Sequence, residues 1–241
     1  MAIVTKIKLG MPQLSYNGLD EIWLFKYCGN KHWGMLEKFV DMNENNDRFY
    51  ASFFNVSLQF KTDQSAFNEN DILTIRSELF EFNTKIYRSV HKFAGCVLTM
   101  DTIFVKKTNI GLLEKHTPST ITTKCKPIKD IGIHAFRHTR LVTKFINDPQ
   151  PGNLLVFPPS TFFNNVKILY FANYLLLVSI SEYMQHRSLL LPIQSIIIHY
   201  YGNTDITSLL YGRTKLHDDN KSTTTYLTVN NETISYCEIK R

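Results

Sequence analysis

The sequence predicts an α+β protein in which antiparallel sheets wrap round long helices. Two observations predict this class: a helical pattern followed by several long strand-like segments, and the return of the same order in the second half of the chain. Hydrophobic residues make up 44% of the 241 residues and aromatic residues 13%, which is enough for a sizeable core.

The first half opens with an alternating strand pattern at residues 3–9, followed by the helical pattern. Asp20 and Glu21 favour a helix start, because acidic residues in the first turn interact well with the helix dipole. Gly29 and Asn30 both tolerate a left-handed backbone, so we expect the helix to end there and a second short helix to cover residues 32–40. Aromatic content and partial alternation predict long strands at residues 49–60, 72–88 and 95–105.

The second half contains the strongest helical pattern of the chain, at residues 166–185, with Pro192 as its stop. Four strand patterns follow it, at residues 195–201, 206–216, 223–229 and 233–240. A sheet wrapped round a helix, present twice, is a double hot-dog fold. A single larger α+β domain and two unrelated α+β domains are the alternatives. We expect a first hot-dog at residues 1–115, a connection at 116–150 and a second hot-dog at 151–241.

Charge and apolar runs limit the class of partner. The net charge of +6 is spread along the chain, which argues against a nucleic-acid partner and fits a phosphate-bearing ligand or an acidic protein. The apolar runs are too short for a membrane span, and the N-terminus does not resemble a signal peptide, so we expect a cytoplasmic protein without a membrane partner. The four cysteines lack metal-ligand spacing, and no metal site is predicted. The sequence does not specify an oligomeric state, and a homodimer is compatible with it.

A set of ordered segments resembles the LnmK-type bifunctional acyltransferase/decarboxylase family of polyketide biosynthesis. These segments are Met11-Pro12, Gly18-Leu19, Trp23-Leu24, Gly29-Asn30-Lys31-His32-Trp33, Tyr50-Ala51-Ser52-Phe53, Phe163-Asn164, Tyr170-Phe171-Ala172, Tyr174, Tyr201-Gly202-Asn203, Asp205 and Lys215-Leu216-His217-Asp218. The resemblance implies a double hot-dog fold and an enzyme that decarboxylates methylmalonyl thioesters and passes on the acyl group. It also implies coenzyme A thioesters as substrates, an acyl carrier protein as partner, and no metal or other cofactor.

Such chemistry requires hydrogen-bond donors at the thioester oxygen, where negative charge develops. By resemblance, Tyr50 is the active-site tyrosine, acting as nucleophile or donor. We expect His32 to follow the helix break and point into a cleft, and Asn164 to reach the substrate from the second half. As substrate-binding groups we expect the backbone N–H groups of Gly29 and Asn30, together with the two side chains Trp33 and Asn203.

Each candidate also has a structural interpretation. Tyr50 suits a packed strand and His32 a buried, hydrogen-bonded position, while Trp33 suits the core. Asn164 suits a helix cap and Asn203 a turn after Gly202.

The alternatives to the decarboxylase and acyltransferase are a hot-dog dehydratase or thioesterase, or a non-catalytic module that binds acyl-CoA or a carrier protein. Asn165 stands where the family has a glycine, and Asn30 where it commonly has an aspartate, and both departures keep the non-catalytic alternative open.

Overall fold

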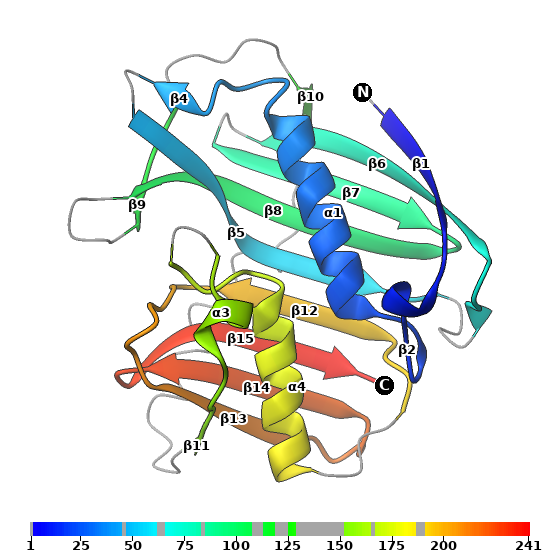
Figure 1. The fold of residues 1–241 in the computed structure, drawn as a ribbon, viewed down its shortest axis with the longest axis vertical. Helices are drawn as coiled ribbons and strands as arrows, with labels where there is room; N and C mark the ends of the chain where they lie inside the picture. Colours follow the sequence, from blue (N-terminus) through cyan, green and yellow to red (C-terminus); the bar gives the residue numbers. More distant parts are fainter. Residues whose placement is uncertain are drawn as a thin grey trace.

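Two helices lie on the same face of one large, curved sheet (Figure 1). The computed structural model describes residues 2–44, 47–61, 66–82, 85–107, 113–118, 125–128, 152–164, 167–186 and 191–241. Most of the predicted connection, residues 116–150, lies outside the described residues. No helix in the described ranges has the length and apolar character of a membrane span.

The order of a helix followed by long strands occurs twice, as predicted. The helices are α1 (Glu21–Leu36), α3 (Pro159–Phe162) and α4 (Asn173–Gln185), and a 3-10 turn covers Met11–Gln13. The long strands are β1 (Ala2–Lys8), β5 (Asp47–Gln59), β6 (Ile72–Phe82), β7 (Ile86–Phe93), β8 (Cys96–Lys107), β12 (Ser195–Tyr200), β13 (Leu210–Leu216), β14 (Ser222–Val229) and β15 (Glu232–Lys240). The short strands are β2 (Leu14–Ser15), β3 (Gly18–Leu19), β4 (Asn43–Glu44), β9 (Leu113–Lys115), β10 (Lys126–Pro127) and β11 (Asn153–Leu154).

The two halves share one sheet instead of forming two separate ones. Its main path is β1-β6-β7-β8-β5-β12-β15-β14-β13-β11, so β5 of the first half pairs with β12 of the second. That pairing is antiparallel and runs from Ser195 opposite Gln59 to His199 opposite Asn55. We call this boundary between the halves the seam. The segment predicted as one strand at 72–88 is instead a hairpin of β6 and β7, which pair with each other.

Helix α1 begins where the sequence predicts, because the Asp20 carboxylate accepts a hydrogen bond from the backbone N–H of Trp23. The predicted end at Gly29 and Asn30 is wrong, since the helix continues to Leu36 and includes most of the predicted second helix. Gly29 serves a close contact instead of a cap. A Cβ atom at that position would lie 2.4 Å from Cζ of Phe171 in the second half.

Helix α4 starts later than predicted, at Asn173. Before it the chain reverses direction: Phe163 forms a β-bridge with Leu169, and Lys167 adopts a left-handed backbone with φ of 63°. A left-handed residue interrupts a right-handed helix, so a helix cannot run through this position. At its other end α4 stops at Gln185, the last residue of the predicted helix.

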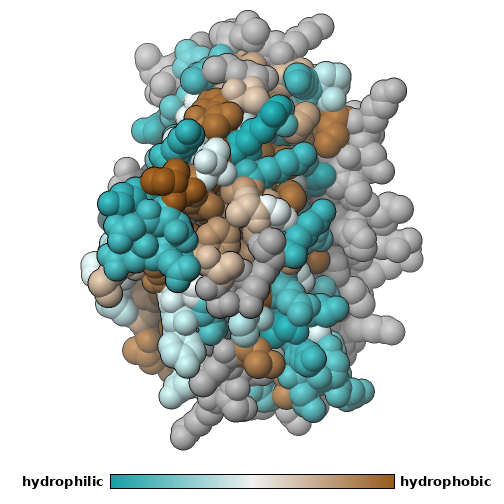
Figure 2. Space-filling view, turned by 90° about the vertical axis from the view of Figure 1, so that its right-hand side faces the viewer, coloured by the Kyte–Doolittle hydropathy of each residue, from teal (hydrophilic) through white to brown (hydrophobic). Residues whose placement is uncertain are grey.

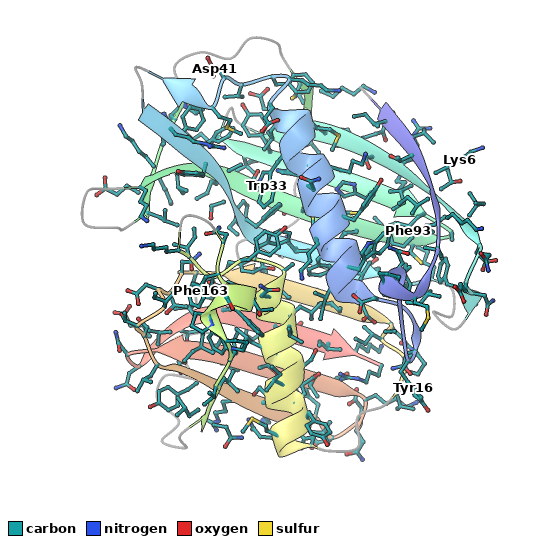
Figure 3. All side chains as sticks on the ribbon, viewed as in Figure 1. Lys6, Tyr16, Trp33, Asp41, Phe93 and Phe163 are labelled. Carbon is teal, nitrogen blue, oxygen red and sulfur yellow. The ribbon has the colours of Figure 1, made fainter. Side chains whose placement is uncertain are left out.

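The main core cluster contains residues of both helices and both halves of the sheet. Helix α1 contributes fully buried Leu24, Phe25 and Cys28, and α4 contributes Leu177 and Val178. One continuous core therefore links the halves, and side chains of both lie between the helices and the sheet (Figure 3).

Candidate functional site

Four aromatic side chains fill the helix side of the seam. They are Trp33 of α1, Phe53 of β5, and Tyr170 and Phe171 from the segment before α4. The ring centroids of Phe53 and Phe171 are 4.3 Å apart, and those of Trp33 and Tyr170 are 6.1 Å apart. We refer to these four residues as the aromatic cluster. It is the place where side chains of both halves meet beside α1.

The aromatic cluster extends from the surface into the core. Phe53 and Phe171 are buried, with 5% and 8% of their surfaces exposed, whereas Trp33 and Tyr170 are half-buried. The indole of Trp33 donates a hydrogen bond to the backbone carbonyl of Ala51 at 3.1 Å, which fixes the ring against β5. The aromatic cluster is therefore an apolar region of the core that is partly exposed at Trp33 and Tyr170.

Tyr170 supplies a polar group to the aromatic cluster. Its hydroxyl makes no hydrogen bond with any described residue. Burial raises the pKa of this hydroxyl to about 12, so it stays protonated and able to donate at neutral pH. From the sequence, Tyr170 was singled out only as part of a segment that resembles the LnmK-type family, and no role was predicted for it. An aromatic pair just before the apolar helix is the signal that could have identified it.

Two of the predicted site residues, Asn164 and Asn203, lie in the loops beside Tyr170. The Asn203 side-chain oxygen accepts hydrogen bonds from the backbone N–H groups of Leu169 at 2.9 Å and Thr204 at 2.7 Å. The Asn164 side-chain oxygen accepts one from Ile168 at 3.2 Å. Asn164 lies well before α4 and so does not cap it. Both side chains hold the loops that carry Tyr170, which is a positioning role.

His32 lies inside α1 and not after its end, so the prediction that it points into a cleft is wrong. The imidazole is fully buried, with Nδ1 2.7 Å from the Ser89 hydroxyl and Nε2 2.8 Å from the Thr102 hydroxyl. Ser89 also contacts His91, whose other ring nitrogen lies 2.8 Å from the Ser77 hydroxyl. Burial lowers the pKa of both histidines to about 3, so both are neutral at physiological pH.

Tyr50 faces away from the aromatic cluster. Its neighbours Phe49 and Ala51 pack in the cluster beneath the end of α1, and successive side chains of a strand point to opposite faces. Tyr50 is therefore on the outer face of the sheet, where the Arg48 guanidinium lies 5.6 Å from its ring centroid. Tyr50 therefore does not face Gly29 and Trp33, which were expected at the same site.

The backbone groups expected from Gly29 and Asn30 are not available either. Both residues lie in the interior of α1, where each N–H bonds to the carbonyl four residues earlier. The Asn30 side chain is exposed to solvent. Of the first-half residues predicted for the site, Trp33 lines the aromatic cluster directly, and Gly29 makes room for Phe171.

A row of polar side chains that the sequence did not predict crosses the outer face of the sheet at the same seam. Arg88 binds the fully buried Asp101 carboxylate through two hydrogen bonds of 2.6 and 2.7 Å, and Asn55 donates to the same carboxylate at 2.8 Å. Asn55 is opposite His199, which in turn is opposite Tyr236. An aspartate within the apolar strand 95–105 is the signal for such a buried ion pair.

A cavity of about 240 Å³ lies at the other end of the helices, between the β2–β3 hairpin and α4. Its wall includes the buried ion pair of Glu182 and Arg241, joined at 2.7 Å. The face of the molecule that carries β1 shows hydrophobic residues in separate groups among hydrophilic ones (Figure 2). Within the described ranges, no group of three or more His, Cys, Asp or Glu residues could hold a metal ion.

Known structures share this architecture over the whole chain. The 12:0-ACP thioesterase from Umbellularia californica is similar with a TM-score of 0.70, 7% identity, and coverage of 99% of this chain and 96% of that one. An acyl-ACP thioesterase from Bacteroides thetaiotaomicron has a TM-score of 0.67, 9% identity, and coverage of 99% and 97%. HtdX from Mycobacterium tuberculosis has a TM-score of 0.56, 8% identity, and coverage of 99% of both chains.

These similarities confirm the predicted double hot-dog fold. No protein-family model matches the sequence, and no curated protein sequence is similar to it.

Proposed function

We propose that this chain binds acyl thioesters at the aromatic cluster and hydrolyses them. The observation that carries the proposal is the similarity over its full length to the 12:0-ACP thioesterase, with a TM-score of 0.70. Binding sites often form where two structural units meet, and the aromatic cluster brings apolar side chains of both halves together beside the Tyr170 hydroxyl. The substrate class is a coenzyme A thioester or an acyl carrier protein thioester.

In this proposal Tyr170 donates a hydrogen bond to the thioester oxygen. Water adds to the carbonyl carbon, negative charge develops on the oxygen, and the C–S bond then breaks to release the thiol and the carboxylic acid. A donor already placed at that oxygen stabilises the transition state. Asn164 and Asn203 hold the loops that present Tyr170. The reaction as written uses no metal and no organic cofactor.

Decarboxylation of a malonyl-type thioester, followed by acyl transfer to a carrier protein, is the second candidate. The ordered resemblance to the LnmK-type family, spread over residues 11–218, favours it. The enolate formed by loss of CO₂ carries its charge on the same thioester oxygen, so the same donor would serve. The net charge of +6 suits an acidic carrier protein.

The two reactions and a dehydration are separated by mass spectrometry of the products. The purified chain is incubated with butyryl-CoA, dodecanoyl-CoA, 3-hydroxybutyryl-CoA and methylmalonyl-CoA, and with the corresponding carrier-protein thioesters. Loss of the whole acyl group indicates hydrolysis, loss of CO₂ indicates decarboxylation, and loss of water indicates dehydration. Saturable binding without any turnover would overturn the proposal in favour of a non-catalytic module.

Two matched variants test the assignment of Tyr170. Tyr170→Phe removes only the hydroxyl, and we expect kcat to fall by about 10²–10³, the usual effect of losing one donor at the developing oxyanion. Tyr50→Phe makes the same chemical change on the outer face of the sheet, and we expect turnover to be unchanged. The opposite result, with Tyr50→Phe inactive and Tyr170→Phe active, would restore the role that the family resemblance gives to Tyr50.

A further inference from the structure

We infer that the aromatic cluster limits the length of the acyl group to short chains, with Phe171 as the residue that closes the space. This inference rests on the proposed function, because it concerns the acyl part of the same substrate. It makes Phe171 a specificity-determining residue.

Phe171 of the second half packs between α1 and β5 of the first half. Its ring lies against α1 at Gly29, where even one additional carbon on the helix would be 2.4 Å from Cζ. On the other sides its centroid is 4.3 Å from that of Phe53 and 5.6 Å from that of Trp33. The ring therefore fills the space between α1 and β5 and leaves little room for a ligand beyond it.

The backbone of Phe171 is held in place, so the ring cannot easily leave this position. Its carbonyl accepts hydrogen bonds from the Tyr200 hydroxyl at 3.2 Å and from the backbone N–H of Tyr174 at 3.3 Å. Burial raises the pKa of the Tyr200 hydroxyl well above its usual value, so this donor is permanent at neutral pH.

The Tyr170 ring lies close to the Phe171 ring. The rings of Tyr170 and Phe171 are 4.9 Å apart, so an acyl chain whose carbonyl meets the Tyr170 hydroxyl reaches Phe171 within its first few methylene groups. Removing the Phe171 side chain would open a dry apolar space, and engineered core cavities of about 150 Å³ accept ligands the size of benzene. The variant should then hold several more methylene groups.

The test measures binding, so that it does not depend on which reaction follows. The probes are two 2-oxoalkyl thioether analogues of coenzyme A esters, one with a four-carbon and one with a ten-carbon chain, which cannot be hydrolysed. Calorimetry gives the ratio of their dissociation constants for the wild-type chain, Phe171→Ala and Phe104→Ala. Phe104 is buried to a similar extent but belongs to a separate core cluster. It therefore controls for the loss of a buried ring.

We expect the wild-type chain to bind the four-carbon analogue more tightly than the ten-carbon analogue. In Phe171→Ala the ratio should shift toward the ten-carbon analogue by at least about tenfold, since each buried methylene group adds affinity. In Phe104→Ala the ratio should stay unchanged. Near-UV circular dichroism establishes that each variant is folded, and Phe171→Leu replaces Phe171→Ala if the alanine variant is not.

An unchanged ratio in the folded Phe171 variant overturns the inference, and so does a wild-type chain that already prefers the ten-carbon analogue. Failure of every variant to bind either analogue also overturns it, because the cluster would then hold no acyl group. A shifted ratio with no turnover of any thioester overturns only the proposed hydrolysis. Turnover with an unchanged ratio overturns only the inference about chain length.

Discussion

Replacing Gly29 with alanine should disturb the packing of α1 against Phe171 of the second half. The added Cβ atom would lie 2.4 Å from Cζ and 2.9 Å from Cε1 of Phe171. These distances are shorter than any normal carbon–carbon contact, so either the ring or α1 must move. The ring is enclosed by Phe53 and Trp33 and its backbone is hydrogen-bonded, so we expect α1 to shift away from the second half.

Two opposing effects determine the size of the change. Alanine is the better helix former and should stabilise an interior helical position by about 0.5–1 kcal/mol relative to glycine. Overpacking of a well-filled core costs about 1–3 kcal/mol. The overpacking should outweigh the gain in helix propensity, and Gly29→Ala should lower the free energy of unfolding by about 1–2 kcal/mol. For a chain of this length that corresponds to a decrease in Tm of about 2–8 °C.

Gly34 provides a matched control in the same helix. A Cβ atom there would meet nothing within 4 Å, so Gly34→Ala should be stabilising by about 0.5–1 kcal/mol. Urea unfolding followed by Trp fluorescence measures both variants. Gly29→Ala combined with Phe171→Leu should regain part of the lost stability. If Gly29→Ala is as stable as Gly34→Ala, the reasoning about the close contact is refuted.

Three further predictions concern the buried polar groups and the helix start. The pKa of His32 and of His91 is lowered to about 3, so the unfolded chain takes up protons below about pH 6.5 that the folded chain does not. The stability from these neutral histidines is complete above pH 6.5 and is lost toward pH 3, at about 1.4 kcal/mol per pH unit for each histidine. Urea unfolding midpoints measured between pH 7 and 5 should show this slope. An unchanged slope in His91→Gln would contradict the prediction. Arg88→Met should leave the Asp101 carboxylate buried without its charged partner and lower the free energy of unfolding by about 3–5 kcal/mol. Arg88→Met combined with Asp101→Leu should recover most of that stability in thermal unfolding. If the single and the double variant lose equal stability, the ion pair does not have this role. Asp20→Ala removes the N-cap of α1 and should cost about 0.5–2 kcal/mol by urea unfolding, while Asp20→Ser should cost less, and no difference between the two variants would count against the cap.

Local pattern was sufficient to predict most of the elements but not all of their ends. Alternation predicted β5 and β8 to within a few residues, and the acidic residues Asp20 and Glu21 predicted the start of α1. The start of α4 was missed because most of the residues before it are apolar, and short apolar runs do not distinguish a helix from a packed loop. The left-handed backbone of Lys167, which ends that periodicity, has no signal in the residue type.

By itself, the sequence determined that a helix followed by long strands occurs in each half, because this order follows from local periodicity and burial preference. The double hot-dog was one of three arrangements that this order allowed, and the family resemblance favoured it. The tertiary structure decided what the site residues do. Gly29 is equally suited to a helix cap and a close contact, and only Phe171, distant in the chain, selects the contact. The partners of His32 lie on β7 and β8, and the face that Tyr50 occupies depends on which side of β5 receives α1. These roles depend on contacts between segments far apart in sequence, which local patterns do not encode.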